Sequence, residues 1–187
     1  MVKHCTADFI EQKLNNYKRK EMAATKRVAA VLLPIVKGEN ECSVIFTKRV
    51  RDLNHHGGEV SFPGGTMDPD DKSLVFTALR ETHEEIGVKP DNVRVLGVMD
   101  DELSRWGHRV TPVVGLIEKA DFKLQETEVD RLYQVPVSHL LNPNIYYSET
   151  WTRDTETREV HFYRYKNDII WGLTARILKD FLDYMVS

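Results

Sequence analysis

The stretch that decides the fold is RETHEEIGV at residues 80–88, which follows the glycine-rich segment FPGG at residues 62–65. On a helix, Glu81, Glu84 and Glu85 occupy positions i, i+3 and i+4, so their carboxylates share one face. Three carboxylates this close repel one another unless positive charge lies between them. A hard divalent cation such as Mg²⁺ or Mn²⁺, which prefers oxygen ligands, relieves that repulsion.

Two features beside the acidic face bear on this interpretation. Arg80 is adjacent, but neighbouring side chains on a helix point about a quarter-turn apart, so we expect Arg80 not to neutralise all three carboxylates. Gly65 allows a close backbone approach, and its carbonyl is a candidate further ligand. Most acidic runs are solvated helix faces. The combination of FPGG with the spaced glutamates instead favours a metal site, an arrangement common in enzymes that cleave phosphoanhydrides.

The rest of the chain alternates between predicted strands and helices. Helices are expected at residues 8–22, 73–86 and 173–185, with a helical turn at 138–141. Strands are expected at residues 28–36, 42–48, 59–62, 93–99, 109–117 and 129–137, with a hairpin at 150–154 and 159–165. This interleaving predicts an α/β fold in which a mixed sheet carries helices on both faces.

The composition narrows the class of protein. A chain of 187 residues fits one domain with a short appendage. The net charge of −3 and the absence of a membrane-length apolar run argue against a general nucleic-acid binder and a membrane protein. Cys5 and Cys42 are too few for a disulfide framework and are expected to be reduced thiols. With no signal-peptide pattern at residues 1–11, we expect a cytoplasmic location.

The stretch at residues 80–88 resembles the Nudix box, Gly-x5-Glu-x7-Arg-Glu-U-x-Glu-Glu-x-Gly-U, where U is apolar. Three features depart from the box. The spacing from Gly65 to Arg80 is one residue longer. The first glutamate is replaced by Asp71 counted from the glycine, or by Lys72 counted from the arginine. Thr82 stands at the first apolar position.

The resemblance implies the Nudix fold, an α/β/α sandwich with a central mixed sheet, over residues 27–187, with residues 1–26 as an N-terminal helical extension. It also implies hydrolysis of a nucleoside diphosphate linked to another group, with Mg²⁺ or Mn²⁺ as the cofactor. The metal ligands that it implies are Glu81, Glu84, Glu85 and Gly65.

Upstream, residues 45–65 read IFTKRVRDLNHHGGEVSFPGG and are similar to the coenzyme A diphosphatase signature, Leu-Leu-Thr-x-Arg-Ser-x3-Arg-x3-Gly-x3-Phe-Pro-Gly-Gly. Thr47, Arg49, Gly58 and the FPGG segment match, whereas Asn54 stands at an arginine position. The longer box is typical of the same branch. This resemblance implies cleavage of coenzyme A (CoA) or acyl-CoA to 3′,5′-ADP and (acyl-)4′-phosphopantetheine.

Basic residues before the box are suited to phosphate oxygens, arginine bidentately. We predict substrate contacts from Arg49, Arg51, Asn54, His55, Gly64 and Arg80. For the general base, Glu81 is a candidate in the box, and Glu126 and Glu128 are candidates on a later loop. We select Glu81 and Glu128 as the catalytic pair.

Two alternatives remain beside CoA hydrolysis. One is a Nudix hydrolase of ADP-ribose, NADH or another nucleoside diphosphate derivative, which loss of the arginine at Asn54 would favour. The other is a catalytically silent domain that binds a nucleotide, against which the intact glutamates argue. The expected partner is a small-molecule nucleotide, with no nucleic acid and no membrane. The sequence leaves the oligomeric state open, a homodimer included.

Overall fold

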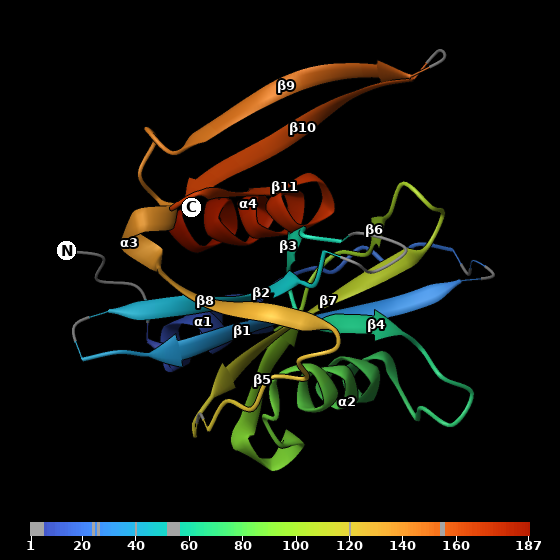
Figure 1. The fold of residues 1–187 in the computed structure, drawn as a ribbon, viewed down its shortest axis with the longest axis vertical. Coiled ribbons are helices and arrows are strands. Elements are labelled where there is room, and N and C mark those ends of the chain that lie inside the picture. The colour runs from blue at the N-terminus through green and yellow to red at the C-terminus, as the bar shows by residue number, and fades with distance from the viewer. Residues whose placement is uncertain are drawn as a thin grey trace.

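The computed structural model describes residues 6–23, 25, 27–39, 41–51, 57–119, 121–153 and 156–187 (Figure 1). Its helices are α1 (Ala7–Asn15), α2 (Leu74–Ile86), α3 (Val137–Leu140) and α4 (Gly172–Val186), with a 3₁₀ turn at Pro90–Asn92. Its strands are β1 (Val28–Lys37), β2 (Cys42–Arg49), β3 (Val60–Ser61), β4 (Gly64–Thr66), β5 (Val93–Val98), β6 (Glu102–Leu103), β7 (Arg109–Ile117), β8 (Val129–Pro136), β9 (Tyr146–Arg153), β10 (Glu156–Tyr165) and β11 (Asp168–Trp171).

The central sheet is mixed. Its main path runs β3-β2-β1-β7-β5, and β4, β6 and β8 pair with β1, β7 and β2. Strand β1 runs parallel to β7 and antiparallel to β2 and β4. Its sequence VAAVLLPIVK is an almost continuous apolar run, as expected for a strand buried on both faces.

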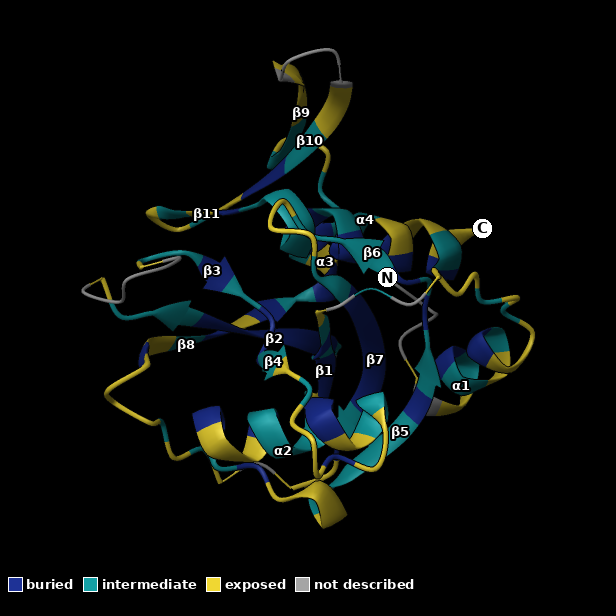
Figure 2. Ribbon diagram, turned by 90° about the vertical axis from the view of Figure 1, so that its right-hand side faces the viewer, coloured by how far each residue is buried: buried dark blue, intermediate teal, exposed yellow. Residues whose placement is uncertain are grey.

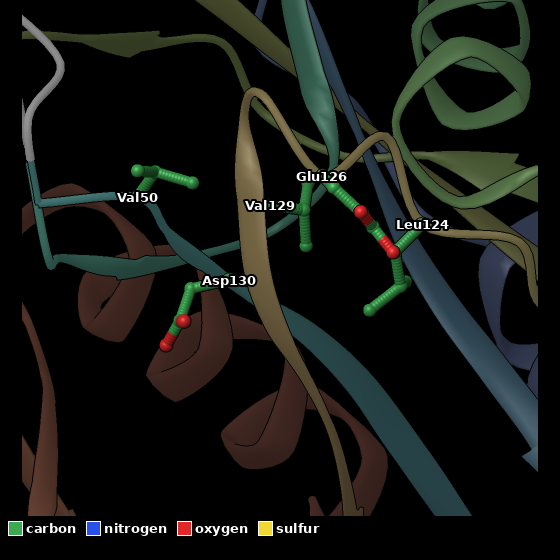
Figure 3. A pocket seen from close by; sticks show the side chains of 5 residues that line it. All are labelled: Val50, Leu124, Glu126, Val129 and Asp130. Carbon is green, nitrogen blue, oxygen red and sulfur yellow. The ribbon is translucent and has the colours of Figure 1, made fainter.

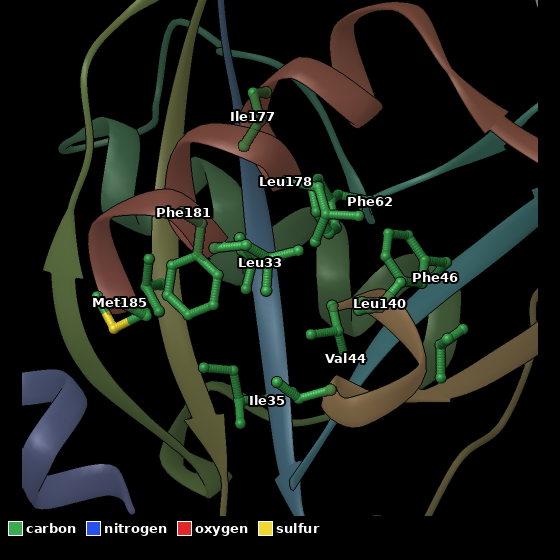
Figure 4. Close-up of a cluster of buried hydrophobic side chains, with 14 of the residues drawn as sticks. Leu33, Ile35, Val44, Phe46, Phe62, Leu140, Ile177, Leu178, Phe181 and Met185 are labelled. Atoms are coloured by element: carbon green, nitrogen blue, oxygen red, sulfur yellow. The ribbon is translucent and has the colours of Figure 1, made fainter. Parts of the chain in front are cut away.

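Alternate side chains of β1 point to opposite faces of the sheet and pack into separate hydrophobic clusters, so the sheet lies between two layers. Leu33 and Ile35 pack with α4 on one face, in the cluster shown in Figure 4. Ala30 and Leu32 pack with α2 on the other face. Helices therefore cover both faces of the sheet, which confirms the predicted α/β/α architecture. No helix within the described ranges is long and apolar enough to cross a membrane.

A second sheet, of strand order β11-β10-β9, extends the predicted hairpin by one strand. Its buried Tyr163 and Ile170 belong to the same core cluster as residues of α4. Figure 1 shows β9 and β10 on the side of α4 away from the central sheet, whereas Figure 2 shows β11 close to β3 of the central sheet. Asp168 of β11 links the two sheets, because it binds Lys48 of β2 at 2.7 Å and accepts a hydrogen bond from Tyr133 of β8. Strand β11 was not predicted from the sequence.

The N-terminal helix is shorter than the predicted 8–22. It ends at Asn15, and the chain beyond binds two aspartates that precede β6. The backbone N–H of Lys20 donates to Asp100, and that of Met22 donates to Asp101. Side-chain carboxylates therefore accept hydrogen bonds from backbone N–H groups that a longer helix would have bonded to its own carbonyls.

Helix α1 is packed on the body through Ile10, which is 1% exposed in the core cluster. Replacing Ile10 by Ala should lower the free energy of unfolding by about 2–4 kcal/mol, because a buried isoleucine leaves a cavity. Chemical denaturation measures this change. Gln12→Ala, on the exposed side of the same helix, should stay within about 0.5 kcal/mol of wild type. Equal effects of the two changes would contradict the packing of α1.

Candidate active site

Helix α2 carries the three glutamates and is capped at both ends. Ser73 accepts a hydrogen bond from the backbone N–H of Phe76 at 3.1 Å, and Gly87 ends the helix in the left-handed conformation at φ 76°. These caps confirm the predicted helix over residues 73–86. The buried Ala78 and Ile86 fix the inner face of α2, so the glutamates lie along the side that borders β4.

The two glycines of β4 permit close approaches of the backbone. Gly64 has φ +154°, and a Cβ there would lie 2.4 Å from the carbonyl oxygen of Ala30, so glycine is required at that position. A Cβ atom on Gly65 would lie 2.5 Å from the carboxylate of Glu81, which would have to move to admit a side chain. The backbone of Gly65 therefore lies directly against Glu81, and its carbonyl stays a predicted ligand.

Arg80 is bonded through its whole guanidinium. Nε and Nη2 donate to the two carboxylate oxygens of Asp71, each over 3.0 Å. Nη1 donates to Glu81 at 2.9 Å and to Glu84 at 3.1 Å. Nη2 also donates to the carbonyl of Thr66, so each of the five N–H groups has a partner. The long side chain thus reaches two of the three box glutamates, and its predicted substrate contact stays a prediction.

Of the two residues that could replace the first glutamate of the box, Asp71 is buried beside Arg80 and Lys72 is exposed. Asp71 is 8% exposed, accepts hydrogen bonds from Thr77 and from the backbone of Asp68, and forms the bidentate pair with Arg80. These bonds, chiefly those from Arg80, hold the pKa of Asp71 well below its usual range. These contacts favour the spacing counted from Gly65.

Glu85 is the most deeply buried of the three glutamates, at 3% exposed. Burial raises its pKa to about 8, and the nearby Glu81 and Glu128 carboxylates add to the rise. The guanidinium of Arg49 lies 3.4 Å from one carboxylate oxygen of Glu85 and opposes the rise. The other oxygen, Oε2, is buried and has no hydrogen-bond partner among the residues that the structure describes. Burial also raises the pKa of Glu81. A carboxylate oxygen left unpaired in this way fits a cation ligand.

Lys48 and Arg49 of β2 point to opposite faces of the sheet, as successive strand residues do. Lys48 binds Asp168 of the second sheet, while Arg49 binds Glu85. The register between β2 and β8 shifts at this point, and the extra residue of the bulge lies in β8. Of the other predicted substrate contacts, Arg51 is exposed, and Asn54 and His55 lie outside the described residues.

A pocket of about 250 Å³, called here the acidic pocket, gathers the candidate catalytic groups. The turn at residues 125–128 closes it, because Gln125 donates its backbone N–H to the carbonyl of Glu85 at 2.9 Å. The N–H of Val50 donates to the carbonyl of Glu128, also at 2.9 Å. The residues lining the acidic pocket are Glu81, Glu84, Glu85, Gln125 and Glu128.

Glu126 lies outside the acidic pocket and lines a neighbouring one of about 470 Å³ (Figure 3). This placement separates the two loop candidates for the general base, which the sequence had left open. Glu128 shares a pocket with the box glutamates, and Glu126 does not.

The donor set of the acidic pocket is chemically that of a hard cation, since all its charged groups are carboxylates. As they stand, no three described His, Cys, Asp or Glu side chains are already arranged around a common metal position. Instead, the guanidinium of Arg80 binds the carboxylates of Glu81 and Glu84. Binding a metal therefore requires their side chains to turn toward the pocket.

Residues 25–167 match the NUDIX domain, and the chain therefore belongs to the Nudix family. Members of this family that are hydrolases act on pyrophosphate bonds and generally use divalent metal cations, typically Mg²⁺ or Mn²⁺. The predicted family membership is confirmed.

Curated relatives support the same assignment. The chain is 39% identical over 160 residues to a protein of Photorhabdus laumondii named uncharacterized Nudix hydrolase NudL, covering 85% of each chain. It is 40% identical over 158 residues to a protein of the same name from Yersinia pestis, covering 84% of this chain and 79% of the relative.

Solved structures confirm the Nudix fold and, at their low identity, the fold alone. A MutT/nudix family protein from Enterococcus faecalis aligns with a TM-score of 0.57 at 15% identity, covering 96% of this chain and 69% of that one. A C. elegans Ap4A hydrolase in a binary complex aligns with a TM-score of 0.51 at 16% identity, covering 62% and 83%.

Replacing Asp71 by Asn should lower the free energy of unfolding by about 2–3 kcal/mol at pH 7, because a charge-assisted pair with Arg80 is lost. The pKa of Asp71 is depressed in the folded state, so its contribution is present above the unfolded pKa and is lost as the pH falls through the folded pKa. The difference from wild type should therefore shrink in acid. Asp70→Asn, at an exposed neighbour, is the control in urea denaturation, and equal effects would contradict the pairing.

Replacing Glu85 by Gln should stabilise the metal-free protein. Because folding raises the pKa of Glu85 from 4.5 to about 8, wild-type stability falls as the pH rises through that interval. Gln removes this fall, so at pH 8.5 with a chelator the melting temperature should rise by at least about 2–4 °C. Glu84→Gln, at a side chain that is 56% exposed, should change it less. A lower melting temperature for Glu85→Gln at this pH would contradict the conclusion that the buried charge of Glu85 destabilises the metal-free protein.

Proposed function

We propose that this protein hydrolyses the pyrophosphate of CoA or acyl-CoA and releases 3′,5′-ADP and (acyl-)4′-phosphopantetheine. One observation carries the proposal: the acidic pocket joins the box glutamates to Glu128, and Arg49 of the CoA-type signature binds Glu85 there. A site that combines clustered carboxylates with an arginine at its edge suits a metal-bound, negatively charged substrate.

The carboxylates of Glu81, Glu84 and Glu85 and the carbonyl of Gly65 would hold Mg²⁺ or Mn²⁺. The fit is supported by the close approach of Gly65 to Glu81 and by the unpartnered Oε2 of Glu85. When bound, the cation supplies charge neutralisation at the phosphate oxygens and a more acidic attacking water.

The protein's own groups have separate tasks in this proposal. Glu128 accepts the proton of the attacking water, with Glu81 as the alternative base within the box. Arg49 and Arg51 donate to phosphate oxygens, and Asn54 and His55 contact the substrate from the same segment. Gly64 contacts the substrate through its backbone. Arg80 holds Glu81 and Glu84 in the metal-free protein, and Nη1 becomes available to the substrate when these carboxylates turn to the metal.

The CoA signature at residues 45–65 separates this proposal from its alternatives. A Nudix hydrolase of ADP-ribose or NADH would need the same acidic pocket, so the pocket alone does not choose between them. The replacement of the signature arginine by Asn54 favours ADP-ribose or NADH as the substrate. The matches at Thr47, Arg49, Gly58 and the FPGG segment favour CoA.

A substrate panel tests the proposal. CoA, acetyl-CoA, dephospho-CoA, ADP-ribose and NADH are incubated with the purified protein in Mg²⁺, in Mn²⁺ and in chelator, and the products are identified by mass spectrometry. We expect metal-dependent release of 3′,5′-ADP from CoA with the highest kcat/KM of the panel. A higher kcat/KM for ADP-ribose or NADH would replace the proposal by the alternative. No turnover of any substrate would indicate a silent domain.

Replacing Glu128 by Gln should lower kcat on CoA by at least about a hundredfold with KM little changed, because a general base acts in the transition state. Glu126→Gln is the matched control: it carries the same change two residues away and outside the acidic pocket, and kcat should stay within a few-fold of wild type. A large loss of kcat in Glu126→Gln alone would transfer the role to that residue. Normal kcat in both variants would leave Glu81 as the base.

A further inference from the structure

The pocket that Glu126 lines has no part in the chemistry proposed so far. Its volume of about 470 Å³ lies within the range of small-molecule sites. Figure 3 shows its side chains arising from β8, from the segment that leads into β8, and from the end of β2. We call it the arm pocket, and its described lining residues are Val50, Leu124, Glu126, Val129 and Asp130.

The arm pocket and the acidic pocket are built on the same short segment. Between residues 124 and 130, Gln125 and Glu128 line the acidic pocket, whereas Leu124, Glu126 and Val129 line the arm pocket. The turn is rigidly placed, because the N–H groups of Glu128 and Val129 both donate to the carbonyl of Gln125 at 2.8 Å. A substrate whose pyrophosphate lies in the acidic pocket therefore extends one of its two ends along this turn.

The lining of the arm pocket selects which end. Its charged groups among the described residues, Glu126 and Asp130, are both carboxylates, and Val50, Leu124 and Val129 are apolar. A phosphate group would be repelled by two like charges, so the 3′-phosphoadenosine end is unsuited to this pocket. An uncharged chain with amide N–H donors and methyl groups is suited to it, because carboxylates accept from amides and apolar side chains cover methyl groups.

The geometry points to the arm pocket as the site of the uncharged amide arm of the substrate, the pantetheine part of CoA. This inference rests on the proposed CoA activity and adds the direction in which the substrate lies. The arm runs along residues 124–130 with its amide N–H groups donating to Glu126 and Asp130. The 3′-phosphoadenosine end then lies away from these carboxylates.

Val50→Trp tests the direction by filling the arm pocket. The two products of the proposed reaction serve as probes, since each carries one end of the substrate. We expect the inhibition constant of 4′-phosphopantetheine to rise about tenfold and that of 3′,5′-ADP to change less than about twofold. The KM for CoA and for dephospho-CoA, which share the arm, should rise together.

The double variant Glu126→Gln/Asp130→Asn tests the same point without added bulk, because both side chains are exposed and their replacement leaves the core unchanged. Neutral acceptors form weaker bonds than carboxylates, so the inhibition constant of 4′-phosphopantetheine should rise about threefold to tenfold. The matched control is Glu118→Gln/Asp91→Asn, which removes two exposed carboxylates that line neither pocket.

The outcomes separate this inference from the proposed function. Wild-type protein that does not cleave CoA overturns the proposed function, and the inference with it, before any variant is made. If the wild-type protein cleaves CoA but both arm-pocket variants weaken inhibition by 3′,5′-ADP, the inferred direction of the substrate is overturned and the proposed function stands. Unchanged inhibition by 4′-phosphopantetheine in Val50→Trp and in the double variant overturns the arm pocket as a subsite.

Discussion

The bidentate pair between Arg80 and Asp71 is the interaction on which the arrangement of the site depends. Four glutamates line one small pocket, and their repulsion would separate them without a cation near them. Arg80 supplies that charge to Glu81 and Glu84, and it is held in place because Asp71 binds two of its nitrogens. Glu85 receives its opposite charge from a different element, through Arg49 of β2.

The second constraint is steric. The backbone at Gly65 lies against the carboxylate of Glu81 because no Cβ stands between them, and β4 can approach β1 only with Gly64 at its position. The opposite directions of Lys48 and Arg49 on β2 have a comparable effect, since Arg49 binds Glu85 while Lys48 binds Asp168. Backbone features of β4 and β2 thus determine which charges meet at α2.

The sequence predicted α2, the central sheet and the helices on both faces, because these depend on local periodicity and on caps such as Ser73 and Gly87. It did not predict β11 as a strand, although its four residues pair with the adjacent β10 across the two-residue turn at residues 166–167. It extended α1 too far, since the competing hydrogen-bond acceptors are the carboxylates of Asp100 and Asp101. Asp100 lies 80 residues from its donor, Lys20, in the chain. Nor did it separate Glu126 from Glu128, because the turn at residues 125–128 decides which pocket each one enters.

The extra residue of the box shows how the fold tolerates a change in its own motif. The distance from Gly65 to Asp71 keeps the family spacing, so the added residue falls between Asp71 and Arg80. Ser73 begins α2 in that interval, and a helix start is a place where one residue is absorbed in the loop without shifting the helix face. Thr77, in the first turns of α2, then binds Asp71 at 2.8 Å and fixes it beneath Arg80. Asp71 and Arg80 therefore meet in this chain although the interval between them is one residue longer than in the box.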